Sequence, residues 1–331
     1  MSARPKVVIT DFITGPLEIE RRILGELADV VALDASSEDD LAGRVDDARA
    51  IMLYHLLPIT ARSIARLKQC KLIVRCGVGF DNVDYRLARE HGIDVANVPD
   101  YGTEEVADSA IGMMLSLTRG ISFLNSRLRE GLGNWTYAQG VPVWRLRGRV
   151  IGIVGLGRIG SAAALRAKAL GMDVAFFDPY APDGRDKSLG IRRVEDFDAL
   201  LGQAHVLSLH CPLTPQTRHL IDAAAIAKMP RGSFLINTAR GAIVDTSALP
   251  AALASGHLAG AGIDVLEAEP PPPDHPLVVA WRNPEHPAYH RLLLNPHSAF
   301  YSEEGLQDMR IKGSEACRRS LLGLPLRNVV N

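Results

Sequence analysis

The sequence has almost no net charge and no long run of basic or of apolar residues. Its 331 residues include 37 lysines and arginines against 38 aspartates and glutamates, and no long basic run occurs. Electrostatic attraction to nucleic acid or to an acidic membrane therefore has no support. No apolar stretch is long enough for a signal peptide or a membrane-spanning helix. We expect neither a nucleic-acid partner nor a membrane partner.

Cysteine is also scarce. The cysteines are scattered without metal-ligand spacing and are Cys70, Cys76, Cys211 and Cys317. They are typical of buried thiols in a reducing compartment, so we expect a cytoplasmic protein. His275, His286 and His290 lie close together in the sequence, but no helical or CxxC-type spacing supports a metal site there. We expect no bound metal and interpret this segment as a proline-rich surface loop.

Two series of short β-type runs alternate with helical stretches along the chain. The first series has its runs at residues 6–10, 29–33, 50–54, 72–76 and 94–98. The second series has its runs at residues 149–155, 173–178, 205–211, 233–239, 259–265 and 291–297. This alternation predicts parallel sheets covered by helices on both faces. With the length of the chain, it predicts an α/β protein of two doubly wound domains, divided near Asp100.

Three other segments have distinct patterns. A broad apolar stripe predicts one long amphipathic helix from Thr103 to about Glu130. Residues 131–148, rich in turn-forming residues, are predicted to be an irregular excursion over the surface. A final amphipathic helix is predicted from Ser302 to about Leu322.

The second series opens with a glycine fingerprint. Gly155, Gly157 and Gly160 form a GxGxxG motif that follows the apolar run VIGIV and precedes a helical stretch. Glycines at these positions permit a tight turn, close approach of a pyrophosphate, and close packing of helix on strand, and the helix N-terminus offers N–H groups to phosphates. Asp178 ends the next run, where an acid accepts hydrogen bonds from ribose hydroxyls and repels the extra phosphate of NADP. We predict NAD as the cofactor.

Three ionisable residues lie at or just after the ends of predicted strands in the second series. Arg240 ends FLINTAR, Glu269 follows AGAGIDV, and His297 ends LLLNPH. An arginine binds a carboxylate bidentately, and a histidine with a pKa near neutrality can donate a proton to a carbonyl oxygen. A carboxylate bonded to the imidazole would favour its charged form and fix its orientation. Taken singly, an arginine at the end of a strand commonly forms an ion pair at the surface, and a histidine before a turn commonly has only a structural role.

Four motifs in order, GLGRIG, NTARG, GIDVLEAEP and NPHSAF, resemble the D-isomer-specific 2-hydroxyacid dehydrogenase family over nearly the whole chain. The resemblance implies a Rossmann NAD-binding domain of residues 101–297. It implies that this domain is inserted into a flavodoxin-like substrate domain of residues 1–100 and 298–331. The predicted fold is therefore two doubly wound parallel-sheet domains, one inserted into the other.

The resemblance also implies roles for individual residues. Arg240 would orient the substrate, His297 would donate the proton in keto-acid reduction, Glu269 would pair with His297, and Asp264 would contact the nicotinamide carboxamide. The substrate residues would be Arg75, Gly77, Val78, Arg240 and Phe300. With the fingerprint, the resemblance predicts a cofactor site made of Val78, Val106, Gly155, Gly157, Arg158, Ile159, Gly160, Asp178, His210, Cys211, Pro212, Thr217, Thr238, Ala239, Arg240, Asp264 and His297.

Within the family, the sequence is most similar to the C-terminal binding proteins, which are transcriptional corepressors that retain the dehydrogenase fold. VRCGVGFDNVD, FFDPY, NTARG and PHSAFYSEEGLQDMR carry this likeness. Those proteins carry an arginine where Arg75 stands and a tryptophan where Phe300 stands, both at the substrate pocket. A departure from the family is the connection over residues 274–291, which is longer than the family's usual connection before the histidine. The longer connection can reshape the mouth of the site or an interface.

Two functions follow from the resemblance, and a non-catalytic cofactor carrier is a third alternative. The first is an NAD-dependent enzyme that interconverts a 2-keto acid and a D-2-hydroxy acid. The second is an NAD(H)-responsive interaction protein in which cofactor binding controls dimerisation and turnover is slight. The complete set of Arg240, Glu269 and His297 favours the enzyme. A small keto or hydroxy acid is the expected partner, with glyoxylate, hydroxypyruvate, a sugar-acid derivative and an apolar keto acid all open. A homodimer joined through the nucleotide domains is expected.

Overall fold

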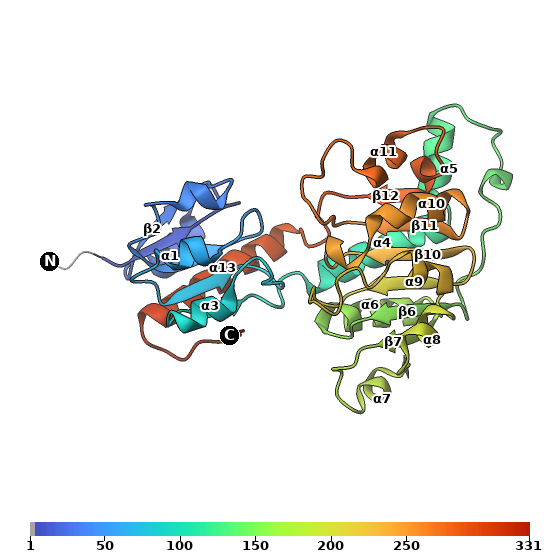
Figure 1. The fold of residues 1–331 in the computed structure, drawn as a ribbon. Coiled ribbons are helices and arrows are strands. Elements are labelled where there is room, and N and C mark those ends of the chain that lie inside the picture. Colours follow the sequence, from blue (N-terminus) through green and yellow to red (C-terminus); the bar gives the residue numbers. More distant parts are fainter. Residues whose placement is uncertain (1–3) are drawn as a thin grey trace. The chain divides into compact units, whose positions relative to one another are not determined.

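The computed structural model describes residues 4–331, so residues 1–3 of the predicted first domain lie outside the described part. The chain forms two compact units (Figure 1). Unit 1 comprises the chain up to Gly102 together with Ser302–Asn331, and unit 2 comprises Thr103–Tyr301. Residues 298–301 group with unit 2 because the amides of Ser298 and Ala299 are bonded to Asp264.

Unit 1 is built on a five-stranded parallel sheet with the order β2-β1-β3-β4-β5. Its strands are β1 (Lys6–Ile9), β2 (Asp29–Ala32), β3 (Ala48–Leu53), β4 (Leu72–Arg75) and β5 (Asp94–Asn97). Every residue of β4 and nearly every residue of β3 is buried, as is usual for parallel strands covered on both faces. This strand order is that of flavodoxin-like folds.

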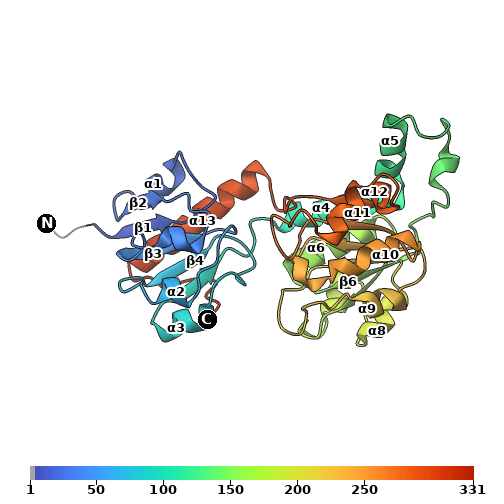
Figure 2. The same ribbon diagram turned by 45° about the horizontal axis from the view of Figure 1, so that its top comes forward.

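The helices of unit 1 come from both ends of the chain. They are α1 (Glu18–Leu24), α2 (Ala61–Ile64), α3 (Tyr85–Glu90) and α13 (Glu303–Leu321), with a 3-10 turn η1 (Glu38–Leu41). The C-terminal helix α13 packs against α1, β3 and β4 (Figure 2). It begins after Ser302, whose hydroxyl accepts a hydrogen bond from the Gly305 amide at 2.8 Å. A salt bridge from Arg310 to the fully buried Glu20, at 2.7 Å, fastens α13 to α1.

Unit 2 is built on a seven-stranded parallel sheet with the order β12-β11-β10-β9-β6-β7-β8. Its strands are β6 (Val150–Val154), β7 (Asp173–Phe177), β8 (Arg192–Arg193), β9 (Val206–Leu209), β10 (Ser233–Asn237), β11 (Leu258–Ile263) and β12 (Leu292–Leu294). The winding reverses between β6 and β9, as in the Rossmann fold, and β12 extends one edge. The predicted fold class, a Rossmann domain inserted into a flavodoxin-like one, is confirmed.

The helices of unit 2 cover both faces of its sheet. They are α4 (Thr103–Thr118), α5 (Ile121–Arg129), α6 (Arg158–Ala169), α7 (Arg185–Leu189), α8 (Phe197–Leu201), α9 (Ala223–Lys228), α10 (Leu249–Ala254), α11 (Pro276–Arg282) and α12 (Ala288–Arg291). Short 3-10 turns are η2 (Tyr137–Gly140), η3 (Gly241–Ile243) and η4 (Thr246–Ala248). Helix α4 packs against α6, β10 and β11, whereas α5 has no buried residue.

The prediction of one helix from Thr103 to Glu130 is wrong. The chain forms α4 and α5 instead, and Gly120 between them has a left-handed backbone with φ +66°. Glycine adopts this conformation without steric cost, and it ends a helix. The apolar stripe alone could not reveal this break.

The interpretation of residues 274–291 as a surface loop is also wrong. Helices α11 and α12 form there, and Leu277, Val278 and Ala288 are buried. Proline is well suited to the first turn of a helix, because its missing N–H would have no partner there, and Pro276 opens α11. The apolar Leu-Val-Val run, rather than the prolines, decides the structure of this segment.

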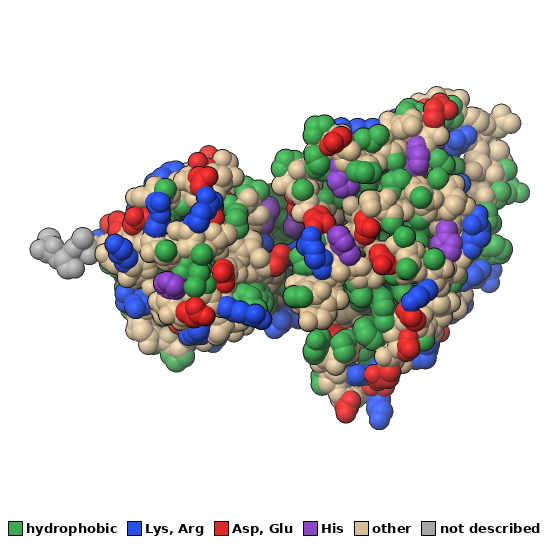
Figure 3. Space-filling view, viewed as in Figure 1, with side chains coloured by type: hydrophobic (Ala, Val, Ile, Leu, Met, Phe, Trp, Pro, Cys, Tyr) green, Lys and Arg blue, Asp and Glu red, His purple; other side chains and the backbone are tan. Residues whose placement is uncertain are grey.

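Acidic and basic side chains are interspersed over the face shown in Figure 3. Among the helices of residues 4–331, none combines the length and apolar character needed to cross a bilayer. Over the same residues, no group of three or more histidine, cysteine or acidic side chains is arranged to hold a metal. The four cysteines are buried free thiols, and burial raises the pKa of Cys70 and Cys76 to about 12.

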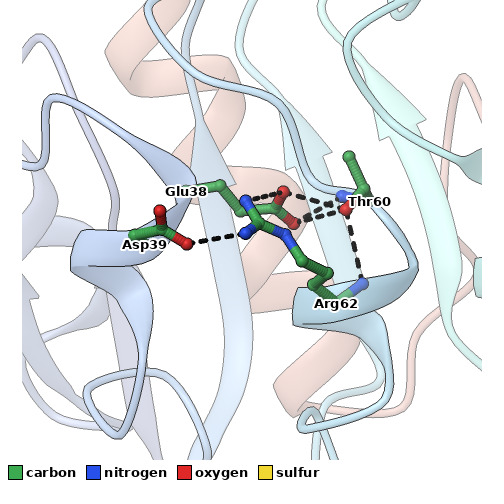
Figure 4. Close-up of polar contacts among 4 residues, drawn as sticks. All are labelled: Glu38, Asp39, Thr60 and Arg62. Carbon is green, nitrogen blue, oxygen red and sulfur yellow. Dashed lines mark hydrogen bonds and ion pairs between the residues drawn. The ribbon is translucent and has the colours of Figure 1, made fainter.

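A buried carboxylate fastens η1 to the start of α2 (Figure 4). Glu38 accepts hydrogen bonds from the Thr60 amide at 2.8 Å and from Arg62 at 3.2 Å, and Arg62 also pairs with the exposed Asp39 at 2.7 Å. Burial raises the pKa of Glu38, but hydrogen bonds from Thr60, Ser63 and Arg62 outweigh it, so the pKa lies below its ordinary value of 4.5. The ionised form therefore stabilises unit 1.

Replacing Glu38 with glutamine should lower the free energy of unfolding by about 1–3 kcal/mol near neutral pH, since buried donors lose a charged acceptor. Because the pKa of Glu38 is lower in the folded state, its contribution is complete above the unfolded value and is lost as the pH falls through the folded one. Urea unfolding near neutral pH and in acid measures both effects. Asp39→Asn is the control and should change little, because Asp39 is exposed. If Glu38→Gln lowered the free energy of unfolding by the same amount at both pH values, the stabilising role of the ionised Glu38 carboxylate would be contradicted.

Candidate cofactor and catalytic site

The turn between β6 and α6 is shaped by three glycines. Gly155 has φ +88°, and a Cβ there would lie 2.6 Å from the backbone nitrogen of Cys211. A Cβ on Gly160 would lie 2.0 Å from the carbonyl oxygen of Gly155, so α6 packs directly on the turn. Gly157 is the N-cap of α6, and a Cβ there would meet nothing within 4 Å. The turn therefore fits a pyrophosphate approaching over Gly157 at the start of a twelve-residue helix.

Asp178 follows β7 beside this turn. One carboxylate oxygen accepts a hydrogen bond from the Leu156 amide at 2.7 Å, and the other accepts from the Tyr180 amide at 2.9 Å. The carboxylate thus braces the glycine turn, a role that the sequence did not reveal. Because a carboxylate oxygen can accept more than one hydrogen bond, the ribose contact predicted for Asp178 stays compatible with this geometry. Arg158 and Ile159, in the first turn of α6, lie at the same helix N-terminus.

The loop after β9 closes over the other side of the turn. His210 is partly exposed, its Nε2 lies 2.9 Å from the Ser208 hydroxyl, and desolvation of the ring lowers its pKa to about 4. The ring is therefore neutral near pH 7. Thr217 donates to the carbonyl oxygen of Pro212 at 2.7 Å and so folds this loop back on itself.

Two buried polar atoms at the carboxyl edge of the unit 2 sheet have no hydrogen-bond partner within residues 4–331. They are Nδ1 of His210 and the hydroxyl of Thr238. Buried polar atoms are nearly always hydrogen-bonded, so two such atoms on neighbouring strands, after β9 and β10, fit contact with a polar ligand. Cys211, beside His210, packs against Gly155 with its thiol protonated, since burial raises its pKa to about 11.

His297 and Glu269 form a hydrogen-bonded pair. Nδ1 of His297 lies 2.7 Å from one carboxylate oxygen of Glu269, and the other oxygen accepts from the Leu266 amide at 2.8 Å. Desolvation raises the pKa of Glu269, but the hydrogen bond and charge of His297, the Leu266 amide and the charge of Arg240 lower it below its ordinary value. The carboxylate is ionised near neutral pH. It therefore fixes the imidazole with Nδ1 toward Glu269.

Asp264 holds the backbone of the loop that carries His297. It is almost completely buried, and its two carboxylate oxygens accept from the amides of Ser298 and Ala299 at 2.9 and 3.0 Å. Its carbonyl oxygen accepts from the His297 amide at 2.7 Å. Desolvation raises the pKa of Asp264 more than these bonds and His297 lower it. Both oxygens thus have backbone partners, and the predicted nicotinamide contact would be an additional one.

Arg240 follows β10 on a loop fixed by Asn237. The side chain of Asn237 donates to the Arg240 carbonyl oxygen at 2.9 Å and accepts from the Ala239 amide at 3.0 Å. Nη1 of Arg240 donates to the Ala239 carbonyl oxygen at 2.8 Å. A Cβ on Gly241 would lie 1.9 Å from the carbonyl carbon of Leu266, so this loop packs against the one that leads to Glu269. Asn237 was not among the predicted residues, although it opens the NTARG motif.

Unit 2 therefore brings Arg240, Glu269 and His297 together. Phe300 is buried beside them, with its ring centroid 6.1 Å from that of His297 in an edge-on arrangement. Val106 lies in the first turn of α4.

Arg75, Gly77 and Val78 belong to unit 1. Arg75 ends β4, and a Cβ on Gly77 would lie 1.5 Å from Nη1 of Arg75, so only glycine leaves room for the guanidinium. Nε of Arg75 donates to the side chain of Asn82 at 3.4 Å. The Val78 carbonyl accepts from Asn97 at 2.7 Å. The five predicted substrate residues are thus divided between the two units.

The fold and the site together define a dinucleotide-binding protein with a histidine–glutamate pair and an arginine at the carboxyl edge of its Rossmann sheet. Residues 111–299, more than half of the chain, match the D-isomer specific 2-hydroxyacid dehydrogenase family, NAD binding domain. The chain belongs to this family, as the sequence motifs predicted, and carries its NAD-binding domain.

Individual relatives agree with this assignment. D-3-phosphoglycerate dehydrogenase of Methanocaldococcus jannaschii is 33% identical over 98% of this chain and 59% of its own length. C-terminal-binding protein 1 of Caenorhabditis elegans is 32% identical over 97% of this chain and 44% of its own length. The chain spans about half the length of these curated relatives. The crystal structure of D-lactate dehydrogenase from Aquifex aeolicus, complexed with NAD and lactic acid, is 26% identical, has a TM-score of 0.86, and matches over 96% of each chain.

The geometry at Asp178 gives a prediction on cofactor choice. NADH should bind more tightly than NADPH, because the Asp178 carboxylate repels a 2′-phosphate. Asp178→Asn should narrow this preference, since it removes the charge and keeps an oxygen for the Leu156 amide. Fluorescence titrations with both cofactors measure the ratio. Equal or tighter binding of NADPH by the unsubstituted protein would show that Asp178 does not select the cofactor.

Proposed function

We propose that the protein is an NAD-dependent oxidoreductase that interconverts a 2-keto acid and a D-2-hydroxy acid. The observation that carries this proposal is the 2.7 Å contact of His297 with Glu269, in the unit that also holds the glycine turn and Arg240. Membership of the 2-hydroxyacid dehydrogenase family supports the same activity.

The cofactor would be held along the carboxyl edge of the unit 2 sheet. Gly155, Gly157, Gly160 and the first turn of α6 would bind its pyrophosphate, and Asp178 its ribose. Residues that would surround the rest of it are His210, Cys211, Pro212, Thr217, Thr238, Ala239, Asp264 and Val106, with Val78 from unit 1. Bound NADH supplies the hydride, and the protein supplies orientation and a proton.

Each member of the catalytic set has a distinct task. Arg240 binds the substrate carboxylate and polarises the neighbouring carbonyl group. As the carbonyl carbon accepts the hydride, its oxygen takes up a proton from Nε2 of His297, and the product is the hydroxy acid. Glu269 holds Nδ1 and stabilises the charged ring before this transfer. In the oxidation direction, His297 accepts the hydroxyl proton.

Replacing His297 with glutamine should reduce keto-acid reduction by roughly 10²–10⁴-fold, the usual contribution of a general acid, while NADH binding persists. Glu269→Gln should have a milder effect. Without the adjacent negative charge, its activity should also fade at lower pH than that of the unsubstituted protein.

Initial rates of NADH oxidation across a pH series, with NADH titrations as the binding control, measure both effects. If both residues only brace the loop, each variant loses stability and keeps the same pH profile. A folded, active Glu269→Gln protein with an unshifted alkaline limb would remove the pair from the mechanism.

We also infer a homodimer, which would serve an enzyme or an NAD(H)-responsive interaction protein. Helix α5 and residues 131–148 carry large exposed apolar side chains, and Ile121, Trp135 and Tyr137 are 58%, 89% and 82% exposed. Exposed apolar clusters of this kind mark interaction sites. The likeness to C-terminal-binding protein 1 is the observation that favours the second function.

Light scattering of the purified protein at micromolar concentration should give twice the mass of one 35.8 kDa chain. A double variant, Trp135→Ala with Tyr137→Ala, should shift the mass toward the monomer. Tyr180→Ala is the matched control, because Tyr180 is as exposed as Trp135 but lies elsewhere on unit 2. A monomer in the presence of NADH would contradict the dimer. A dimer that requires NADH, with no keto acid reduced, would favour the interaction protein.

A further inference from the structure

Helix α4 lies directly on strand β11, and two glycines of the strand permit this close packing. A Cβ on Gly260 would lie 3.0 Å from Cδ2 of Leu117, and a Cβ on Gly262 would lie 3.0 Å from Cβ of Met113. Alternate residues of a strand share one face, so both glycines belong to the face that α4 covers. As the strand advances by two residues, the contact moves back along α4 by four.

Continuing this series by one step leads to Ser109 on α4 and to Asp264 just after β11. Four residues of an α-helix rise about 6 Å and two residues of a parallel strand rise about 6.6 Å, so the two elements stay in step. The Ser109 hydroxyl donates a hydrogen bond to the carbonyl oxygen of Ala299 at 3.1 Å. Helix α4 is therefore bonded to the loop that carries His297, a link that the sequence did not reveal.

This bond completes a clamp on the backbone of Ala299. The buried Ala299 donates its amide to the Asp264 carboxylate at 3.0 Å and accepts from Ser109 at its carbonyl. Hydroxyl side chains inside helices commonly bond to the carbonyl four residues earlier, as Thr118 does with Met114 at 2.7 Å. The Ser109 hydroxyl instead bonds outside its own helix, so its bond connects two separate elements.

The helix that carries Ser109 is itself fixed to α6. Arg166 of α6 forms ion pairs with Glu104 and Asp108 of α4, and its Nε lies 2.6 Å from the Asp108 carboxylate. Helix α6 begins at the glycine turn, and α4 also packs on β10 and β11. Ser109 therefore ties the loop of His297 to a helix that is held by the sheet and by α6.

We propose that Ser109 is a positioning residue for His297. Without the hydroxyl, the Ala299 carbonyl loses this bond, and the loop holds the left-handed backbone of His297 less firmly. The imidazole then spends less time in contact with Glu269, and fewer molecules present an aligned proton donor. The proposal rests on the proposed keto-acid reduction and adds to it a residue that acts through the loop.

Ser109→Ala should lower the kcat of keto-acid reduction about 10-fold or more, because a misplacement of about 1 Å can cost about 10²-fold. The ratio kcat/KM should fall equally and both KM values should stay unchanged, since a proton donor acts in the transition state. Ser109→Thr keeps the hydroxyl and should restore most of the activity. NADH oxidation by the purified full-length protein with glyoxylate, hydroxypyruvate and phenylpyruvate measures these values.

The matched control is Ser116→Ala on the same helix. Ser116 shares a hydrogen bond with the hydroxyl of Ser122 in α5, so this variant also removes one hydroxyl contact of α4. Because the contact lies away from the loop of His297, kcat should stay unchanged. A loss as large as that of Ser109→Ala would show that any weakening of α4 lowers the activity, and would overturn the inference.

Proton NMR tests the same inference without turnover. A short hydrogen bond between an imidazole N–H and a carboxylate moves its proton far downfield of other protein protons. The signal of the His297 Nδ1 proton should be present in the unsubstituted protein and absent from His297→Gln. Faster exchange with water should weaken it in Ser109→Ala, but not in Ser109→Thr or Ser116→Ala.

The two measurements separate this inference from the proposed function. In a folded Ser109→Ala protein, an unchanged kcat or an unchanged downfield signal would overturn the positioning role and leave the proposed function standing. An equal loss of activity in Ser109→Thr and Ser109→Ala would do the same. If the unsubstituted protein reduces none of the keto acids while the signal responds as expected, the proposed function fails and the positioning of His297 by Ser109 stands.

Discussion

The pairing of His297 with Glu269 depends on one buried carboxylate, that of Asp264. His297 has a left-handed backbone with φ +51°, a conformation that costs roughly 1–3 kcal/mol for a residue other than glycine. The Asp264 carboxylate offsets this cost through two hydrogen bonds, from the amides of Ser298 and Ala299, and the backbone carbonyl of Asp264 accepts a third from the His297 amide; each is worth about 1 kcal/mol or more. Released from Asp264, the loop would relax and carry the imidazole away from Glu269. His297, the proposed proton donor, is thus positioned by a residue that need not touch the substrate.

The same device recurs at the carboxyl ends of several other strands. Asp11 and Asn82 fix the loops of unit 1, and Asn237 and Asp264 fix those of unit 2. Parallel strands deliver their loops to one edge, but neighbouring loops there share no ladder of backbone hydrogen bonds. Short side chains with two or more polar atoms, of which those of Asp11, Asn237 and Asp264 are buried, supply the missing connections. Rigid loops of this kind are what a preorganised site requires.

Much of the fold could be predicted from sequence, because buried parallel strands appear as short apolar runs and Rossmann glycines occur at fixed spacing. The errors have local causes. An apolar stripe does not reveal that Gly120 takes a left-handed backbone, and the prolines near α11 hid an apolar face. The sequence could identify Arg240, Glu269 and His297 as candidates because the charge and proton-transfer chemistry of a side chain follow from its residue type. Asn82 and Asn237 could not, since a bridging carboxamide is defined only by the loops that it joins in three dimensions.

The hydrogen bonds made by Arg75 in unit 1 and by Arg240 in unit 2 also bear on the carboxylate binding proposed for each arginine. An arginine side chain carries roughly 2 kcal/mol of rotamer entropy, equivalent to about a 30-fold change in Kd if all of it is lost on binding. Asn82 and Gly77 already order the guanidinium of Arg75, and the Ala239 carbonyl already holds Arg240. Much of the conformational entropy of these two side chains is therefore lost when the protein folds rather than when a ligand binds. A keto acid offers few atoms for contact, so this preordering is a large part of the affinity that such a site can reach.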